Sequence, residues 1–426
     1  MEFEVENRTM KNVFVLSPIR IHNGNSAGSA RMMNIARALT MEGIKVYLCS
    51  SELQYKYSQN NIREVAPNIF LVGKEHRNNV GMIKNILHRL FHTCIITNYL
   101  WNVTRLAKSI KGEKVLYLYP TGVLSMELIT LLLFKGIYRH KIFCDVNELR
   151  RATLVNSVFS KNMIKMVWQK YIWLLDFIKY YGVENLTRHY DGLVVISTNI
   201  EHYFGRYNKR LLKIPILSEV SSSSSSSSPP IFTAGGNFSI CFAGMIALKK
   251  EGFDIFYEAL SLLKTKYKNF ELHLYGPINK YTKGLLLTDI PEKFGIKDNI
   301  FYHGILAQQN IIKEMRKYHL LVLPRPLNMQ THYGFSTKLS EYMISGVPVL
   351  VTAVSDNEIY IKDNYNGFIV KPGDAEAMAN KIFKIIENYN KVAHQISINA
   401  FDTARKCFNY SNYSSILSAF LFNKSK

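Results

Sequence analysis

The feature that most constrains the fold is an alternation of short apolar runs with longer amphipathic ones. In the first half of the chain, β-rich runs recur at 13–17, 45–50, 69–73, 114–119, 141–146 and 192–197, with helical periodicity between them. After residue 230 the pattern restarts, with runs at 239–244, 270–276, 299–304, 320–324, 348–353 and 367–370. Near-continuous apolar strands separated by helices indicate parallel sheets that are covered on both faces. We therefore predict an α/β protein with two successive parallel sheets.

A run of eight serines at 221–228, followed by Pro229 and Pro230, separates the two patterns. This composition does not pack and predicts an exposed connection, although a modified or recognised serine tract is an alternative. A chain of 426 residues also exceeds the usual size of one hydrophobic core. We predict an N-terminal domain at 1–218, a linker at 219–236, a second domain at 237–399 and a C-terminal helix at 400–426. The periodicity does not decide which domain that helix joins.

Several negative features favour a cytoplasmic protein. The chain has no run of about 18 uncharged apolar residues, and its start, MEFEVENRTM, lacks the apolar region of a secretion signal. The five cysteines show no CxxC spacing and no neighbouring histidine pair, so we expect buried thiols in a reducing compartment. We expect neither a metal nor another cofactor. The cysteines are Cys49, Cys94, Cys144, Cys241 and Cys407.

The net charge of +21 is unevenly distributed. Residues 1–218 carry 30 Lys and Arg against 15 Asp and Glu, which suits an anionic membrane surface or anionic substrates. No nucleic-acid-binding motif is present, so a nucleic acid is not an expected partner. The segments 82–111 and 158–179 mix aromatic and aliphatic residues with Lys and Arg at helical intervals, as interfacial helices do. The alternative is that both helices cover the sheet of their own domain.

The stretch YGFSTKLSEYMISGVP at 333–348 predicts a short helix with an anion-binding start. Ser336 and Thr337 are good N-cap residues, and Gly346 supplies the C-terminal stop. Free backbone N–H groups at the helix start, with the mobile charge of Lys338, suit a phosphate. Glu341 suits a neutral polyol such as a ribose. An ordinary capped helix is the alternative.

Other candidates follow the strands, because open parallel sheets bind ligands beyond the carboxyl ends of their strands. Gly24 and Gly28 follow the first strand and precede a helix expected near Ala30. This loop lacks both GxGxxG and GK[ST], which disfavours a dinucleotide enzyme and a P-loop NTPase. Lys249 and Lys250 stand before a helix predicted at 253–263.

Asp145 and Glu148 follow the fifth apolar run and are candidates for contact with an acceptor hydroxyl. The alternative is that these loop carboxylates offset Arg150 and Arg151. His332, beside the 333–348 stretch, is a further candidate polar contact.

The order of these motifs resembles that of GT-B glycosyltransferases, and more narrowly of the retaining family 4 (group 1) glycosyltransferases. The resemblance rests on FAGMIALKKEGFDIFYEAL at 242–260, YGFSTKLSEYMISGVPVLVT at 333–352 and NGFIVKPGD at 366–374. It implies two Rossmann-like domains whose parallel sheets face a central cleft. It also implies that the second domain binds a nucleotide-sugar donor and the first an acceptor. Transfer in this family retains the anomeric configuration and is usually metal-independent.

The resemblance also implies roles for individual residues. Glu341 would bind the ribose hydroxyls, Ser336 and Thr337 the diphosphate, and Lys250 a phosphate, while Gly28 would let the phosphates approach the first domain. The expected donor-binding set is Gly28, Lys250, Arg325, His332, Tyr333, Gly334, Phe335, Ser336, Thr337, Lys338 and Glu341.

Three positions depart from the family pattern. Tyr333 stands where the first Glu of E-x7-E would contact the sugar, so His332 is a candidate replacement. Met245 replaces the arginine after the glycine, leaving Lys250 with Lys249 or Arg325 to neutralise the diphosphate. Asn147 replaces the histidine of the first domain.

The resulting hypothesis is a cytoplasmic glycosyltransferase at the membrane surface. It would transfer a sugar to a lipid-linked or polysaccharide acceptor in bacterial surface glycan synthesis. A nucleotide-sugar epimerase of the same fold and an inactive nucleotide-binding scaffold are the alternatives.

Overall fold

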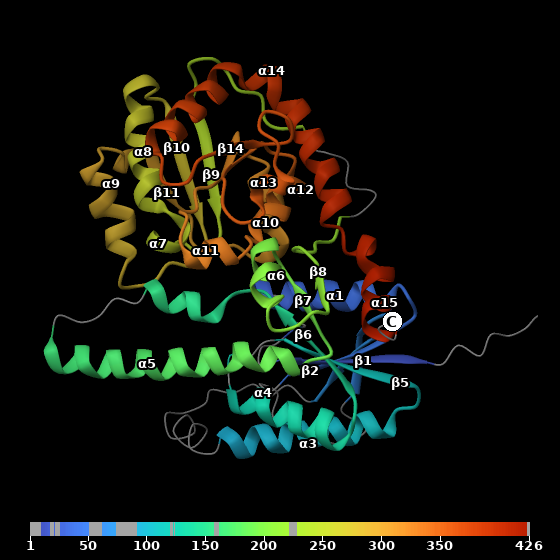
Figure 1. Ribbon diagram of the computed structural model, residues 1–426. Helices are drawn as coiled ribbons and strands as arrows, with labels where there is room; N and C mark the ends of the chain where they lie inside the picture. The colour runs from blue at the N-terminus through green and yellow to red at the C-terminus, as the bar shows by residue number, and fades with distance from the viewer. Residues whose placement is uncertain are drawn as a thin grey trace, which may run out of the picture. The chain divides into compact units, whose positions relative to one another are not determined.

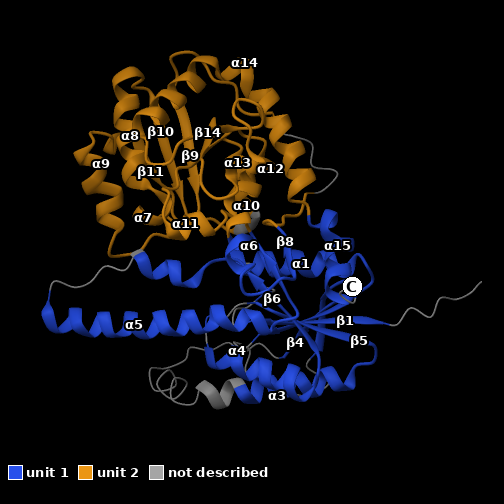
Figure 2. Cartoon of the chain, in the orientation of Figure 1, with its two compact units in different colours: residues 1–196, 200–214, 410–426 blue, residues 197–199, 215–409 orange. Residues whose placement is uncertain are grey.

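The chain forms two compact units in the computed structural model (Figure 2). Unit 1 comprises residues 1–196, 200–214 and 410–426, and unit 2 comprises residues 197–199 and 215–409. The structure describes residues 10–17, 21, 26–50, 62–73, 92–119, 122, 124–156, 162–220 and 228–423. Gly24, serines 221–227, and residues 82–91 and 158–161 of the two basic apolar segments lie outside the described residues.

Unit 1 is built on an eight-stranded sheet in the order β3-β4-β2-β1-β5-β6-β7-β8 (Figure 1). Its pairs are parallel, except that β3 runs antiparallel to β4. The six apolar runs predicted in this half all form strands, but the two edge strands β3 and β8 are additional. The strands are β1 Lys11–Ser17, β2 Lys45–Ser50, β3 Ile62–Ala66, β4 Ile69–Val72, β5 Glu113–Leu118, β6 Lys141–Val146, β7 Gly192–Val195 and β8 Leu211–Lys213.

Helices of unit 1 connect and cover these strands (Figure 1). The helix after β1 begins at Ala27, because the Ser26 side chain accepts from Ser29 N and forms its N-cap. Gly28 therefore lies in the first turn of this helix, which begins three residues before the expected Ala30. The helical elements are α1 Ala27–Thr40, α3 His92–Ser109, α4 Leu124–Thr130, η2 Leu131–Ile137, η3 Arg150–Asn156, α5 Met163–Leu186, η4 Thr187–His189, α6 Thr198–Phe204, η7 Tyr410–Tyr413 and α15 Ser414–Phe422, with the start of α6 assigned to unit 2.

The C-terminal segment differs from the single helix expected at 400–426. The helix α14, Ala375–Cys407, ends at Phe408, and a separate helix α15 follows the turn η7. The residues of α15 belong to unit 1, where Phe420 packs on Phe143 with ring centroids 5.3 Å apart. Arg210 lies over both rings, at 5.1 Å from each centroid. Aromatic packing therefore places α15 on unit 1, a choice that the periodicity of the sequence did not decide.

A buried ion pair connects the elements of unit 1. Arg31 of α1 donates through Nε to both carboxylate oxygens of Asp145 on β6, at 2.9 and 3.0 Å. Tyr117 of β5 donates to the same carboxylate at 2.8 Å, and Arg31 Nη1 donates to Ile214 O at 3.2 Å. Arg31 and Asp145 are almost completely buried, so each charge depends on the other for compensation.

Replacing Asp145 by Ala should destabilise unit 1 by about 3–5 kcal/mol, because the Arg31 guanidinium would remain buried without its counter-ion. Urea unfolding followed by circular dichroism will measure this as a lower midpoint. Asp176→Ala, which removes a partly exposed ion pair with Lys179, is the control and should change stability by less than about 1 kcal/mol. Equal midpoints for the two variants would contradict the assigned role of the buried pair.

Unit 2 contains a six-stranded parallel sheet in the order β11-β10-β9-β12-β13-β14 (Figure 1). All six apolar runs predicted after residue 230 form its strands. The chain first adds strands on one side of β9 and then on the other, so the topological switch lies between β9 and β12. The strands are β9 Phe238–Ala243, β10 Phe270–Tyr275, β11 Ile300–Tyr302, β12 Leu320–Leu323, β13 Val349–Thr352 and β14 Phe368–Val370.

The helices of unit 2 place apolar side chains against both faces of this sheet. The predicted helix at 253–263 is confirmed as α8, and the stretch 333–348 contains α12. The helical elements are α7 Leu248–Glu251, α8 Phe253–Lys266, η5 Leu285–Asp289, α9 Ile290–Lys293, η6 Lys297–Asn299, α10 Gln308–Met315, α11 Met329–Tyr333, α12 Lys338–Ser345, α13 Asn357–Tyr360 and α14 Ala375–Cys407.

Two glycines at the ends of β9 and β10 bring backbone segments unusually close. Gly276 has φ +130°, and a Cβ atom there would lie 2.0 Å from the carbonyl oxygen of Gly244. Gly244 has φ +154°, and its Cβ would lie 1.8 Å from Cε of Lys338. Only glycine avoids both contacts, so the carboxyl edge of the sheet leaves space for the Lys338 side chain.

Within the described part of the chain, no helix is both long and apolar enough to cross a membrane. Cys49, Cys144 and Cys241 are free and buried, as expected, whereas Cys407 is half-buried.

Candidate functional site

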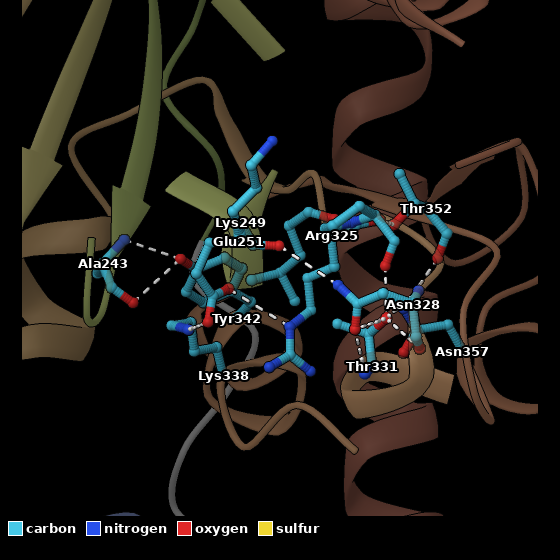
Figure 3. A network of polar contacts seen from close by, with 12 residues as sticks. Ala243, Lys249, Glu251, Arg325, Asn328, Thr331, Lys338, Tyr342, Thr352 and Asn357 are labelled. Atoms are coloured by element: carbon cyan, nitrogen blue, oxygen red, sulfur yellow. Dashed lines mark hydrogen bonds and ion pairs between the residues drawn. The ribbon is translucent and has the colours of Figure 1, made fainter. Parts of the chain in front are cut away.

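A cluster of polar residues of unit 2 lies at the carboxyl edge of its sheet, near the ends of β9 and β12 (Figure 3). They come from α7, from the segment after β12, from the end of β13 and from the first turn of α12. Crevices at such switch points are the usual ligand sites of open α/β sheets. We therefore consider this cluster the candidate site.

The helix α12 begins and ends near the predicted positions, but its N-terminus is not capped as predicted. Gly346 has φ +77° and forms the C-cap. Thr337 occupies the N-cap position in a helical conformation, and its side chain makes no capping hydrogen bond. The Ser336 hydroxyl is buried, with 4% of the residue exposed, and has no hydrogen-bond partner among the described residues. Neither predicted cap side chain therefore satisfies the start of this helix.

The Lys338 ammonium is fixed rather than mobile, contrary to the sequence prediction. Its Nζ lies 2.9 Å from a carboxylate oxygen of Glu251, and Arg325 Nε lies 3.4 Å from the other oxygen (Figure 3). Lys338 also lies over the ring of Phe242, 5.0 Å from its centroid. Two cations thus share one carboxylate, which leaves an excess of positive charge beside the start of α12.

Burial and neighbouring charge oppose each other at this cluster. Burial alone would raise the pKa of Glu251, but Arg325 and Lys338 outweigh it, and the carboxyl pKa lies below its ordinary value. Burial lowers the pKa of Lys338, and the attraction of Glu251 offsets this lowering only in part. Glu251 is therefore the group that allows the two cations to remain in a buried place.

Hydrogen bonds hold α12 against the sheet and its neighbours. The Tyr342 hydroxyl accepts from Ala243 N at 2.8 Å and lies 3.2 Å from Ala243 O as a donor, which joins α12 to the end of β9 (Figure 3). The hydroxyls of Ser340 and Ser218 lie 2.8 Å apart. These bonds place the first turn of α12 at the carboxyl end of β9.

A second set of bonds orders the segment that carries Arg325 (Figure 3). Thr352 Oγ1 donates to Arg325 O at 2.6 Å, and Asn357 Nδ2 donates to Thr352 O at 2.9 Å. Asn328 caps α11 through a capping box with Thr331 and donates to Lys249 O at 3.3 Å. The backbone around Arg325 is therefore held from β13 and from α7.

The two predicted lysines occupy different environments on α7. Lys250 is half-buried next to Glu251, and its charge contributes to lowering the pKa of that carboxyl. Lys249 is exposed and forms a 3.4 Å ion pair with Asp254. Lys250 accordingly joins the basic cluster, whereas Lys249 lies in solvent.

His332 and Tyr333 end the helix α11, where their main-chain carbonyls are bound. Ser197 Oγ donates to Tyr333 O at 2.8 Å, and Asn199 Nδ2 donates to His332 O at 2.9 Å, all within unit 2. The two rings form an edge-to-face pair with centroids 4.9 Å apart. Gly334 is the C-cap residue of α11.

Phe335 and Glu341 flank the first turn of α12 in different ways. Phe335 is buried, and its ring packs on those of Tyr360 and Phe408. Its side chain is therefore part of the core. Glu341 is half-buried in the first turn of the helix.

The candidate residues of the predicted N-terminal domain lie in unit 1. Both oxygens of Asp145 are engaged by Arg31, and the residue is fully buried, so the carboxylate serves the core ion pair. Glu148 pairs with Arg150 at 2.7 Å, which is the charge-offsetting arrangement considered as its alternative. Asn147 Nδ2 donates to the Tyr119 hydroxyl at 2.7 Å.

Sequence reasoning missed Glu251 and Asp356. Glu251 is a single acid between Lys250 and Gly252, and this isolated charge was the signal available in the sequence. Asp356 is buried and accepts from the backbone N–H and the hydroxyl of Thr198, at 3.0 and 3.1 Å. Such a contact across 158 positions leaves no local pattern. Among the described residues, no group of three or more His, Cys, Asp or Glu could hold a metal ion.

Residues 237–388 match the protein family described as "Glycosyl transferases group 1". This segment contains the β9, α7, β12 and α12 elements of the candidate site. No curated protein matches the chain by sequence.

Several solved structures share the fold. Sucrose-phosphate synthase from Thermosynechococcus elongatus is 14% identical with a TM-score of 0.67, and the match covers 96% of this chain and 97% of that one. Anabaena HepE in complex with UDP is 15% identical with a TM-score of 0.62, covering 97% and 99%. The lipopolysaccharide outer core galactosyltransferase WaaB is 12% identical with a TM-score of 0.63, covering 97% and 100%. At these identities the likeness establishes the GT-B fold.

The candidate site has the chemistry of an anion receptor. Lys338 and Arg325 supply positive charge, and the start of α12 supplies the positive end of a helix dipole. Ser336 supplies a hydroxyl that no described residue binds. Glu251 neutralises part of the charge. An incoming anion would compete with this carboxylate for the two cations.

Replacing Glu251 by Gln should destabilise unit 2 in a pH-dependent manner. The folded pKa of Glu251 lies below its ordinary value of 4.5, so its stabilising effect is present above that pH and disappears as the pH falls through the folded value. At neutral pH we expect a loss of about 3–5 kcal/mol, because two buried cations lose their counter-ion.

Thermal unfolding of both proteins across this pH range will measure the effect, and the gap between their melting temperatures should shrink in acid. Asp402→Asn, in the exposed pair with Arg405, is the control. A gap that stays constant from neutral pH to strong acid would show that Glu251 is not the titrating group.

Proposed function

We propose that this chain, which has the GT-B fold, is a retaining glycosyltransferase that uses a nucleotide-sugar donor. The acceptor that we propose is a hydroxyl of a lipid-linked or polysaccharide glycan of the bacterial surface. The family match over residues 237–388 and the resemblance of the motifs at 242–260, 333–352 and 366–374 support this proposal.

The observation that carries the proposal is the basic cluster at the start of α12. Arg325 is buried and Lys338 is largely buried at the carboxyl edge of the sheet, and the neighbouring Ser336 hydroxyl has no described partner. Buried charges are rare unless they serve a partner or a ligand. A nucleoside diphosphate supplies the negative charge and the hydrogen-bond acceptors that this cluster can bind.

Similar structures indicate which donor to test first. HepE was crystallised with UDP and, separately, with UDP-glucose. WaaB is described as a galactosyltransferase of the lipopolysaccharide outer core. For this chain we therefore propose a uridine nucleotide as the first probe, with Glu341 binding the ribose hydroxyls.

The site would accelerate transfer by stabilising the leaving group. Negative charge develops on the diphosphate as the bond to the sugar breaks, so Lys338, Arg325 and the start of α12 would stabilise the transition state more than the bound donor. In our proposal a donor phosphate oxygen accepts the proton of the acceptor hydroxyl as the new glycosidic bond forms. The reaction then needs neither a protein nucleophile nor a metal ion.

We propose that the enzyme works at the cytoplasmic face of the membrane, where a lipid-linked acceptor would be presented. The positive charge of residues 1–218, with 30 Lys and Arg against 15 Asp and Glu, supports attraction to an anionic surface.

Thermal-shift measurements with nucleoside diphosphates and nucleotide sugars will test the donor site. A true donor at 100 times its Kd should stabilise the protein by about 2.7 kcal/mol. Transfer to a glycan acceptor, without conversion of free nucleotide sugar, will distinguish the transferase from an epimerase. If no nucleotide shifts the melting curve, the proposed donor site is wrong.

Substitutions will show whether the basic cluster is that site. Gly244→Ala should weaken nucleotide binding at least tenfold, because the new methyl group would occupy the position of Lys338 Cε and displace the ammonium. Glu341→Ala should weaken it by removing the ribose contact. Asn147→Ala, in unit 1, is the control and should leave nucleotide affinity unchanged. Unchanged affinity in the Gly244 and Glu341 variants would place the donor elsewhere.

A further inference from the structure

The helix α5, Met163–Leu186, exposes an unusual amount of apolar surface. Ile164 is 82% exposed and Trp168 is 62% exposed. In Figure 1 the helix extends beyond the strands of its own unit. Its exposed large apolar residues are Met163, Ile164, Val167, Trp168, Tyr171, Ile172, Leu174, Leu175, Ile178 and Tyr181. Solvent exposure of this much contiguous apolar surface usually marks an interaction site.

Five of these residues form one stripe, which we call the outer face of α5. Ile164, Trp168, Tyr171, Leu175 and Ile178 follow one another at intervals of four and three residues, so they lie on the same side of the helix. The arrangement is that of an amphipathic helix whose apolar side faces away from the protein.

The opposite side of α5 is the one that packs on unit 1. Trp173 Nε1 donates to Leu154 O of η3 at 3.1 Å, and the Trp173 ring stacks on Phe177 at 5.5 Å. Arg151 lies over the Phe177 ring and pairs with Glu184 at 3.0 Å. The helix is thus anchored by its inner side, and the outer face is not needed for that contact.

Basic residues border the outer face. Within the described residues, Lys165 and Lys170 form no ion pair, whereas Lys179 pairs with Asp176 at 2.5 Å. Lysine side chains beside an apolar stripe can bury their methylene groups while their ammonium groups reach lipid phosphates. Trp168 and Tyr171, whose rings lie 5.7 Å apart, are residue types that favour the interface of a bilayer.

The helix α3 provides a comparison within the same unit. Its segment has a similar mixture of apolar and basic residues, yet Tyr99, Leu100, Val103 and Leu106 are buried in unit 1. Similar composition therefore has two outcomes in this chain. α3 covers its own domain, and α5 presents an apolar face to the surroundings.

We propose that the outer face of α5 inserts into the interface of an anionic lipid bilayer and anchors the enzyme there. This inference rests on the proposed function, since it supplies the element that would bring the active enzyme to a lipid-linked acceptor. Insertion would bury the apolar stripe at the depth of the acyl boundary and place Lys165 and Lys170 among the headgroups.

Charge favours a bilayer over a second copy of the chain as the occupant. Residues 1–218 carry twice as many basic as acidic residues, so two copies of this surface would repel each other. Within α5 the two acids, Asp176 and Glu184, already pair with Lys179 and Arg151. An anionic lipid surface supplies the missing negative charge.

Flotation of the full-length protein with vesicles will test the inference. We expect binding to vesicles of phosphatidylcholine with phosphatidylglycerol, and weaker binding to phosphatidylcholine alone. The triple variant Ile164→Ser, Trp168→Ser and Leu175→Ser should bind at least tenfold more weakly, since it removes three inserted side chains. Lys170→Gln should weaken binding about fivefold.

A matched variant, Trp101→Ser with Leu132→Ser and Ile305→Ser, replaces exposed apolar residues outside α5 and should bind vesicles like the parent. Failure of the parent to bind anionic vesicles, or equal binding by both triple variants, would overturn the inference. So would a parent that is dimeric in light scattering and becomes monomeric in the α5 variant without any vesicle binding.

Nucleotide thermal shift on the same samples separates this inference from the proposed function. Loss of vesicle binding with an intact nucleotide shift contradicts only the role of α5. Vesicle binding that depends on α5, without any nucleotide shift, contradicts only the donor site.

Discussion

The shared ion cluster of Glu251, Lys338 and Arg325 is the interaction on which the candidate site depends. One buried carboxylate holds two cations that come from α12 and from the segment after β12. Without it, both cations would lack their counter-ion in a largely buried place. The same carboxylate also neutralises part of the positive charge that an anion would meet, so it affects both the stability of the site and its attraction for an anion.

Glycines at the ends of β9 and β10 leave space for this cluster. Lys338 can lie against the end of β9 because Gly244 has no Cβ, and the neighbouring approach of Gly276 to Gly244 excludes a side chain there as well. The Tyr342 hydroxyl then joins α12 to Ala243 through two hydrogen bonds. Electrostatics, backbone conformation and hydrogen bonding therefore all bring the start of α12 to the switch point of the sheet.

The two units contribute different physical interactions to the proposed function. Unit 2 concentrates buried charge at a strand edge, where a low dielectric makes each charge more effective. Unit 1 carries most of the net positive charge and leaves the outer face of α5 exposed. In our proposal, this charge attracts an anionic bilayer over a long range and the apolar face inserts into it. We thus propose that unit 2 binds the donor and that α5 of unit 1 binds the membrane.

Local patterns in the sequence predicted much of this structure. The twelve strands that were expected all form, because a buried parallel strand requires a continuous apolar run. The strands β3 and β8 were missed because β3 is partly exposed and β8 has three residues, too few for a pattern. Glu341 and Lys338 were recognised from a local helix motif, but Glu251 was not, since its partners lie 74 and 87 positions away.

By itself, the sequence determined the α/β class, the two successive sheets and the candidate helix at 338–345, because these depend on periodicity and on residues close in the chain. Only the tertiary structure decided that Lys338 is tied to Glu251, that Asp145 serves a core ion pair and that α5 is exposed while α3 is covered. Each of these depends on which distant segment lies nearby. Burial and charge pairing are properties of the folded neighbourhood, and a linear pattern does not contain them.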